Sequence, residues 1–201
     1  MQQFDFIGYT LQKGYGRFAV DGRTGAGKTN LAVYMVTTLK RITKQNVYSN
    51  IWLSYKYRKL TKDMIKTLPP ELNNCIMLID EMHMWGGDSY KFLSKQSEEL
   101  TLLFTQLRKR KITLIYTVQH YTGMIAVRLR KNTDMLFHCT EASNLTASML
   151  PYNKKGETLV TSGVEVHFID EFTGDPLDTI HVFLFDGKPY WKYYDTDEIV
   201  I

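Results

Sequence analysis

Several patterns are missing or scarce in this chain of 201 residues, and each absence narrows the class of protein. No apolar run approaches the roughly 18 residues that a membrane-spanning helix needs, so we expect no membrane span. The first residues lack the basic and apolar regions of a secretory signal peptide. The two cysteines, Cys75 and Cys139, lack metal-ligand spacing and lie in separate apolar stretches, which favours reduced thiols in the core of an intracellular protein.

The composition is that of a globular protein, with 44% hydrophobic and 23% charged residues and no internal repeats. The length suffices for one sizeable domain, and we expect residues 1–201 to form it. The net charge of +4 is unevenly distributed: residues 1–164 carry 23 Lys and Arg against 12 Asp and Glu, whereas residues 165–201 carry 2 against 9. A basic body suits a polyanion partner, although a solvated surface explains the same counts equally well.

Residues 22–29 match the phosphate-binding loop G-x-x-x-x-G-K-[ST] between an apolar run and a helical pattern. The glycines let successive N–H groups point at one anion, and the following helix adds its positive N-terminal end. In such a loop Lys28 would contact the β- and γ-phosphates of ATP, and the Thr29 hydroxyl would bind Mg²⁺. We expect the nucleotide to be held by Gly22, Arg23, Thr24, Gly25, Ala26, Gly27, Lys28, Thr29 and Asn30.

A second element of the expected site is the apolar run 75–79, which is typical of a buried parallel strand and ends in Asp80 and Glu81. In proteins with a phosphate-binding loop, an Asp at the end of such a strand holds Mg²⁺. Glu81 would lie beyond the strand end near the γ-phosphate, where a carboxylate can orient and deprotonate an attacking water. Two surface acids at a strand end are the alternative, which the phosphate-binding loop roughly 50 residues upstream disfavours.

The hydrophobic pattern predicts an α/β fold: a RecA-like core at about residues 17–140 and a C-terminal β extension at about 160–201. Core strands are expected at 17–22, 47–53, 75–81, 112–119 and 135–139, and helices at 28–43 and 97–111. The pair Asp186-Gly187 predicts a hairpin between strands at 179–185 and 188–194, with Pro189 on an edge strand. Residues 1–16 alternate roughly and could form an edge strand or an arm against a neighbour.

Two basic clusters lie outside the loop, at residues 55–66 and 108–111. The first interleaves lysines with tyrosines, which suits a nucleic-acid backbone and base stacking, although a surface helix with snorkelling lysines is slightly favoured. The second fits the end of a helix, or else supplies an arginine to another subunit. Trp85, in a loop after Glu81, can contact nucleotide, DNA or a neighbouring subunit, or can simply cap the core.

Together the phosphate-binding loop, the strand ending in Asp80-Glu81 and the strand ending in Gln119 resemble the FtsK/HerA superfamily of DNA-pumping ATPases. Within it the chain is similar to the short packaging ATPases of viruses with double-jelly-roll capsids, including archaeal ones. The resemblance implies that Gln119 senses the γ-phosphate. It also implies an arginine that acts in trans eleven positions before Gln119, which is Arg108, with Arg110 as the alternative.

The expected function is therefore ATP hydrolysis, with Mg²⁺, coupled to moving double-stranded DNA into a capsid. The resemblance implies a ring of identical subunits, most simply a hexamer, with viral capsid proteins as partners, in the host cell cytoplasm or at the virion vertex. A nucleoside or nucleotide kinase is one alternative, although the tandem acids favour water as the acceptor. The other is a nucleotide-gated assembly factor without turnover, as among filamentous-phage morphogenesis proteins, which usually carry a membrane span.

Overall fold

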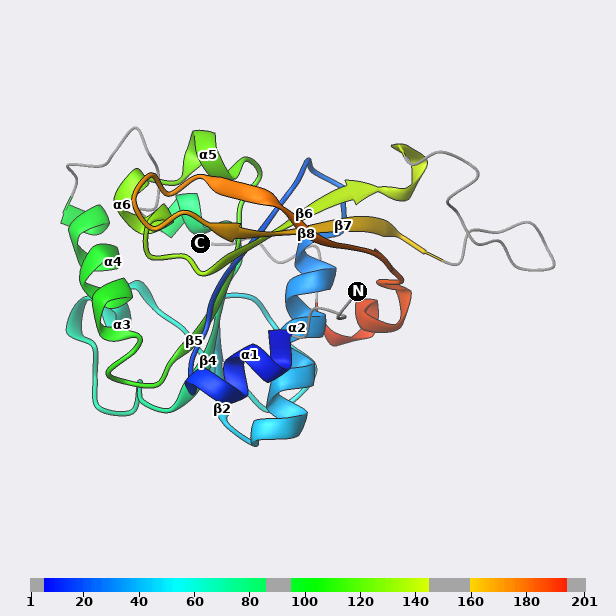
Figure 1. Cartoon of the computed structure of the whole chain (residues 1–201). Coiled ribbons are helices and arrows are strands. Elements are labelled where there is room, and N and C mark those ends of the chain that lie inside the picture. Colours follow the sequence, from blue (N-terminus) through cyan, green and yellow to red (C-terminus); the bar gives the residue numbers. More distant parts are fainter. Residues whose placement is uncertain (1–5, 86–94, 145–159, 195–201) are drawn as a thin grey trace.

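An eight-stranded sheet forms the centre of the computed structural model, which describes residues 6–85, 95–144 and 160–194 (Figure 1). The spatial order of the strands is β3-β2-β4-β5-β1-β6-β7-β8. Strands β3 to β6 in this order run parallel, whereas β7 pairs antiparallel with both β6 and β8. This confirms the mostly parallel sheet with an antiparallel C-terminal extension. The strands are β1 (Arg17–Asp21), β2 (Asn46–Ser49), β3 (Arg58–Lys59), β4 (Cys75–Ile79), β5 (Thr113–Thr117), β6 (Met135–Glu141), β7 (Ser162–Ile169) and β8 (Pro176–Phe185).

Helices cover both faces of the sheet (Figure 1). One face is covered by α1 (Phe6–Lys13) and α2 (Lys28–Thr43), together with the short helix η5 (Lys188–Tyr193). The other face carries α3 (Lys62–Thr67), η1 (Met82–Trp85), α4 (Lys95–Gln106), α5 (Tyr121–Met124) and α6 (Val127–Arg130). A further short helix, η3 (Ala142–Asn144), follows β6. No helix among the described residues is long and apolar enough to cross a bilayer.

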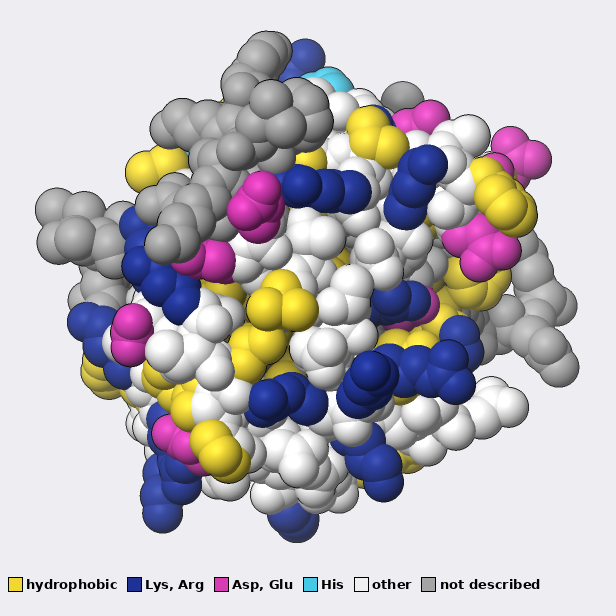
Figure 2. All heavy atoms as spheres, turned by 90° about the vertical axis from the view of Figure 1, so that its left-hand side faces the viewer, with side chains coloured by type: hydrophobic (Ala, Val, Ile, Leu, Met, Phe, Trp, Pro, Cys, Tyr) yellow, Lys and Arg dark blue, Asp and Glu magenta, His cyan; other side chains and the backbone are white. Residues whose placement is uncertain are grey.

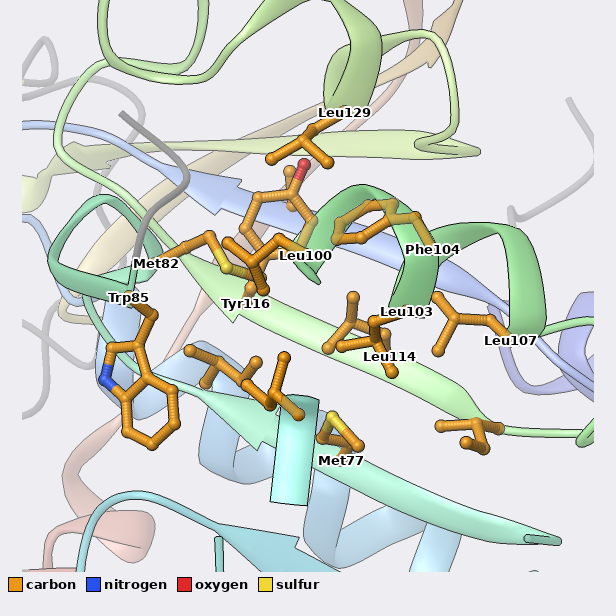
Figure 3. Close-up of a cluster of buried hydrophobic side chains, with 14 of the residues drawn as sticks. Met77, Met82, Trp85, Leu100, Leu103, Phe104, Leu107, Leu114, Tyr116 and Leu129 are labelled. Carbon is orange, nitrogen blue, oxygen red and sulfur yellow. The ribbon is translucent and has the colours of Figure 1, made fainter. Parts of the chain in front are cut away.

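The central strands are buried on both faces, so successive residues contribute to two separate cores. Met77 and Ile79 of β4 face the α4 layer, whereas Ile76 and Leu78 face α2. On the α4 layer the helix contributes the predicted stripe of Leu100, Leu103, Phe104 and Leu107 (Figure 3). This two-sided burial explains why the strands appear in the sequence as continuous apolar runs.

Trp85 caps the core, one of the roles considered from the sequence. Its side chain is buried in the cluster that contains Met82 and Leu100 (Figure 3). The Lys62 ammonium lies 5.8 Å from the centre of the indole ring, in a cation–π arrangement. The residues that follow, 86–94, lie outside the described part of the chain.

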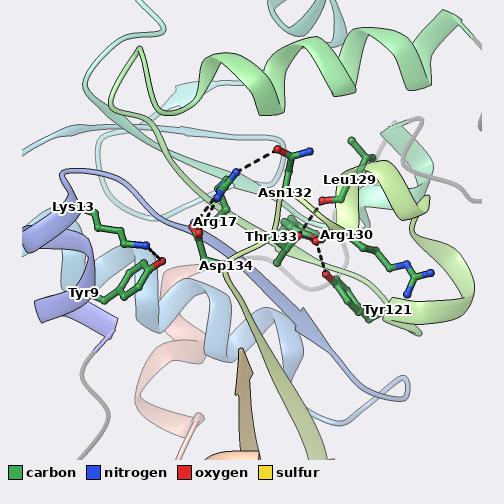
Figure 4. A network of polar contacts seen from close by, with 10 residues as sticks. Tyr9, Lys13, Arg17, Tyr121, Leu129, Arg130, Asn132, Thr133 and Asp134 are labelled. Carbon is green, nitrogen blue, oxygen red and sulfur yellow. Dashed lines mark hydrogen bonds and ion pairs between the residues drawn. The ribbon is translucent and has the colours of Figure 1, made fainter. Parts of the chain in front are cut away.

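The N-terminal segment forms helix α1, not the edge strand or arm expected for residues 1–16. Phe6 meets the rings of Phe18 and Phe137 edge-on at 6.3 and 6.4 Å between centroids. Phe6 and Thr10 are buried one helical turn apart, which is the pattern of a helix that packs one face on the sheet. Next to it, Arg17 forms an ion pair of 2.8 Å with Asp134 and ties the start of β1 to the start of β6 (Figure 4).

The predicted hairpin around Asp186-Gly187 is wrong, because the antiparallel hairpin is formed by β7 and β8. Its turn lies at residues 170–175, where the Asp170 carboxylate accepts hydrogen bonds from two backbone N–H groups. Gly187 has a φ of −82°, so it lacks the positive φ of a type I′ turn. Residues 188–193 form η5, and Pro189 lies in its first turn rather than on an edge strand.

Smaller corrections concern the two basic clusters. Residues 55–60 are not helical: Tyr55 and Lys56 lie in a bend, and Arg58–Lys59 form the short strand β3. Only Lys62–Thr67 are helical, so the expected surface helix is much shorter. Helix α4 ends at Gln106 and the cations 108–111 lie in the following turns, where Lys111 has a φ of 50°. The two cysteines are free and buried as expected, and burial raises the pKa of each thiol to about 12.

Candidate active site

The phosphate-binding loop connects β1 to α2 at the carboxyl edge of the parallel strands. Gly27 has a φ of 89°, which favours glycine, and the space beside it is filled. A Cβ atom at Gly27 would lie 2.3 Å from Oγ of Ser162 in β7. That Ser162 hydroxyl donates a hydrogen bond of 2.7 Å to the carbonyl of Ala26. The C-terminal extension therefore contacts the phosphate-binding loop directly, through Ser162.

A cavity of about 280 Å³ opens at this edge of the sheet. Lys28, which is buried, lines it and donates a hydrogen bond of 3.1 Å to the carbonyl of Arg23 across the loop. The arrangement places an ammonium group and the N-terminal end of α2 at one cavity, as an anionic phosphate requires. The lining residues are Thr24, Gly25, Gly27, Lys28, Thr29, Asn30, Ile51, Asp80, Glu81 and Tyr194. Of the predicted nucleotide-binding residues, Gly22, Arg23 and Ala26 belong to the loop but do not line this cavity.

Asp80 and Thr29, the two predicted metal ligands, lie in contact although 51 positions separate them. The Thr29 hydroxyl donates a hydrogen bond of 3.1 Å to Oδ1 of Asp80. Burial raises the pKa of Asp80, and the hydrogen bond from Thr117 opposes this shift. A hydroxyl and a carboxylate oxygen match the ligands of Mg²⁺, which takes the rest of its coordination from phosphates and water. These two side chains therefore fit the expected metal.

Glu81 follows in a left-handed conformation, with a φ of 52°, and lines the same cavity. Its backbone N–H donates a hydrogen bond of 2.9 Å to the Thr117 hydroxyl. The unusual φ turns the chain out of the strand direction immediately after Asp80. Consecutive carboxylates consequently reach one cavity, one beside Thr29 and one beyond it.

Sequence reasoning missed two side chains that hold Asp80. The Asn50 amide exchanges hydrogen bonds of 2.8 and 2.9 Å with the backbone of Asp80. The Thr117 hydroxyl donates a hydrogen bond of 2.7 Å to Oδ1 of Asp80. Both residues lie at the carboxyl ends of β2 and β5, the two neighbours of β4. The rule that the ends of parallel strands meet at one edge could have identified them.

Tyr194 is a third missed residue, and nothing in the local sequence signals it. It is buried, lines the cavity, and donates a hydrogen bond of 2.8 Å from its hydroxyl to Oδ1 of Asn30. Burial, and secondarily the Asp80 carboxylate, raise the pKa of Tyr194 to about 12, so it remains a neutral donor. It reaches the site because it pairs with Leu53 in an isolated β-bridge.

The remaining predicted residues lie outside the cavity lining. Gln119 is exposed two positions beyond β5, at the same edge of the sheet. Arg108 is exposed in the turn before β5, at the amino ends of the parallel strands. The phosphate-binding loop of the same subunit lies at the carboxyl ends, so the two are separated. Arg110 donates hydrogen bonds of 3.0 and 3.2 Å to the carbonyls of Pro69 and Leu72. A third arginine, Arg130, is buried and forms an ion pair with Asp175.

Thr117→Val should weaken Mg²⁺-dependent nucleotide binding by about 10-fold, since outer-shell partners of a metal ligand typically contribute 10- to 100-fold to affinity. The substitution keeps the shape and removes the hydroxyl that holds Asp80 and Glu81. Thr113→Val is the matched control, because Thr113 lies on the same strand with a buried hydroxyl that has no partner among the described residues. A magnesium titration with a fluorescent ATP analogue measures both variants, and equal losses would contradict the role of Thr117.

His138 should make stability depend on pH. Its Nδ1 lies 2.8 Å from Oδ1 of Asp21 at the end of β1, and this hydrogen bond raises the pKa of His138. A raised folded-state pKa stabilises the protein fully below the unfolded pKa of about 6.5, and the effect is lost as the pH rises through the folded value. Because the imidazole is 44% exposed, we expect less than about 1 kcal/mol. Urea unfolding of the parent and of His138→Gln should differ more at pH 5.5 than at pH 8; an equal difference would contradict it.

Comparison with known proteins supports the fold. No protein-family model and no curated protein match the chain. The N-terminal domain of zonular occludens toxin from Neisseria meningitidis is similar in structure, with a TM-score of 0.62 over 90% of this chain and 100% of that one, at 16% identity. The genome-packaging NTPase B204 of Sulfolobus turreted icosahedral virus 2, in complex with ATP-gammaS, gives 0.53 over 86% of this chain and 97% of that one, at 13% identity. At such identities the likeness establishes a shared phosphate-loop ATPase fold, as the sequence resemblance predicted.

Proposed function

We propose that this protein hydrolyses ATP with Mg²⁺ and uses the energy to move double-stranded viral DNA into a preformed capsid. The proposed ATP hydrolysis rests on one observation: Thr29, Asp80 and Glu81 line the same cavity as Lys28, and Thr29 is hydrogen-bonded to Asp80. Structures of the similar B204 packaging NTPase contain AMPPCP and ATP-gammaS, which supports a nucleotide in this cavity. The proposed movement of DNA rests on the likeness to that packaging NTPase and on the excess of Lys and Arg in residues 1–164.

The side chains divide the work in a way that follows from their chemistry. Lys28 and the N-terminal end of α2 neutralise the β- and γ-phosphates, and Thr29 and Asp80 would hold Mg²⁺. Glu81 orients a water molecule and accepts its proton as the water attacks the γ-phosphorus, while the bond from this phosphorus to the bridging oxygen breaks and ADP leaves. Gln119 senses the γ-phosphate, and Arg108 of a neighbouring subunit stabilises the charge that develops during transfer. This last contribution requires a ring, for which we propose a hexamer.

A rate measurement separates this function from its alternatives. Phosphate release from ATP is measured with no added acceptor, with and without duplex DNA, over a range of protein concentrations. Release without an acceptor contradicts a nucleoside kinase, and stimulation by duplex DNA supports translocation. Binding of ATP with negligible turnover would instead favour a nucleotide-gated assembly factor.

Lys28→Ala should lower ATP affinity by about 10- to 100-fold and abolish turnover, because it removes a charge-assisted contact to the phosphates. Lys40→Ala on the same helix is a control that removes a lysine distant from the loop. Nucleotide binding measured by titration calorimetry, with circular dichroism to verify the fold, tests this. Parent-like turnover in Lys28→Ala would contradict the proposed ATPase.

A further inference from the structure

A groove beside α2 has no role in the nucleotide site. It measures about 390 Å³ and is lined by Thr37, Lys40, Arg41, Lys44, Tyr55 and Tyr193. One wall is the second half of α2, and the other combines the segment after β2 with the end of η5. Three of the six lining residues are cations and none is acidic.

The floor of the groove is aromatic. The rings of Tyr55 and Tyr193 meet edge-on at 6.1 Å between centroids, and Tyr190 lies 6.1 Å from Tyr193. Both Tyr55 and Tyr193 are half-buried, so ring surface remains accessible from the groove. Aromatic faces of this kind accept any nucleobase, because stacking does not depend on the base sequence.

Positive charge is concentrated at this groove. The Lys40 ammonium lies 4.6 Å from the centre of the Tyr55 ring and donates a hydrogen bond to the carbonyl of Lys56. At the rim, the Lys192 ammonium lies 5.2 Å from the centre of the Tyr193 ring. Within the described ranges, no carboxylate forms an ion pair with Lys40, Arg41, Lys44, Lys56 or Lys192. Gathered like charges repel one another, and a polyanion would relieve that repulsion.

Two arginines of the basic clusters at residues 55–66 and 108–111 are engaged in hydrogen bonds within the fold. Arg58 donates a hydrogen bond of 2.9 Å to the Tyr48 hydroxyl, and Arg110 binds two carbonyls. Figure 2 shows Lys and Arg side chains gathered over the lower part of a face that lies to the left in Figure 1, so charge alone is widespread. The groove adds half-buried aromatic rings to the charge.

We propose that this groove binds single-stranded DNA, with backbone phosphates at Arg41 and Lys44 and a base against Tyr193. A duplex fits less well, because its base faces are covered by neighbouring base pairs and only the cationic rim could touch it. The inference rests on the proposed function in that DNA is the polyanion which this protein meets. The groove is connected to the nucleotide cavity through residues 51–55 and 193–194, which contribute to both sites. Ile51 and Tyr194 line the nucleotide cavity, and the N–H of Ser54 donates a hydrogen bond of 3.0 Å to the carbonyl of Tyr193.

The test measures anisotropy of a labelled thymidine oligonucleotide and of a duplex of equal length, at several salt concentrations. Arg41→Gln/Lys44→Gln should lower affinity for the single strand about tenfold at low salt and flatten the logarithmic salt dependence by about 1.4, at about 0.7 per phosphate contact. Lys66→Gln/Lys131→Gln is the matched control, because these exposed lysines also lie at helix C-termini. Tyr193→Leu should lower affinity by about 5- to 150-fold, whereas Tyr193→Phe, which keeps the ring, should bind like the parent.

The proposed binding site would be contradicted if Arg41→Gln/Lys44→Gln and its control double variant lost the same affinity. Equal binding by Tyr193→Leu and Tyr193→Phe would also contradict it. So would a parent protein that binds duplex but not the oligonucleotide. In each of these three cases, ATPase activity stimulated by duplex DNA would leave the proposed translocation intact. ATP hydrolysis that no DNA stimulates, with no binding of either DNA, would instead contradict translocation itself.

Discussion

Arg108→Ala should bind ATP almost normally and hydrolyse it about 10³–10⁵-fold more slowly, the range expected for an arginine supplied by a neighbouring subunit. The physical reason lies in the sheet. The phosphate-binding loop lies at the carboxyl edge of the parallel strands, whereas Arg108 precedes the amino end of β5 and is exposed. In a head-to-tail ring, different faces of two copies meet, so one subunit's Arg108 can approach its neighbour's cavity. Turnover of the parent should accordingly rise more than linearly with protein concentration as rings assemble.

Arg110→Ala serves as the control and should show the opposite result. Arg110 binds the carbonyls of Pro69 and Leu72 within its own subunit. Its loss should lower the free energy of unfolding by about 1–3 kcal/mol and leave the rate per assembled ring close to that of the parent. If Arg108→Ala hydrolyses ATP like the parent at every concentration, Arg108 is a surface residue of the turn with no role in catalysis.

Glu81→Gln should retain ATP binding with Mg²⁺ and lose about 10²–10⁴-fold in hydrolysis, the contribution of a positioned general base. The substitution keeps the size of the side chain and, because the backbone is unchanged, the hydrogen bond from its N–H to Thr117. Magnesium remains with Thr29 and Asp80, so binding and catalysis should separate. Single-turnover hydrolysis and equilibrium binding of ATP measure the two properties. Lost binding with residual turnover would make Glu81 a metal ligand and not the base.

Mixing the two inactive variants gives a further test of both assignments. A ring assembled from Arg108→Ala and Glu81→Gln subunits contains some interfaces with an intact Glu81 on one side and an intact Arg108 on the other. Activity should return on mixing only if these residues act across subunits. If both acted within one subunit, the mixture would remain as inactive as its components.

The sequence by itself determined the parts of the site that local chemistry dictates. A loop that wraps an anion needs glycines, a lysine and a hydroxyl within eight positions, so residues 22–29 identify it without any long-range information. Helix α2 has the expected bounds, 28–43, because its apolar spacing and the loop before it coincide. The strand before Asp80 was predictable because burial on both faces demands an uninterrupted apolar run.

Only the tertiary structure decided which residues surround that loop, because those contacts join segments far apart in the chain. Tyr194 reaches Asn30 across 164 positions, and Ser162 reaches Ala26 across 136. The same dependence explains the errors at both ends. The apolar residues of α1 and η5 have short, ambiguous patterns, and what selects helix over strand there is packing against Phe18 and α2. Local patterns predict the chemistry of a phosphate site, whereas its walls and the groove beside it exist only because the folded sheet brings distant segments together.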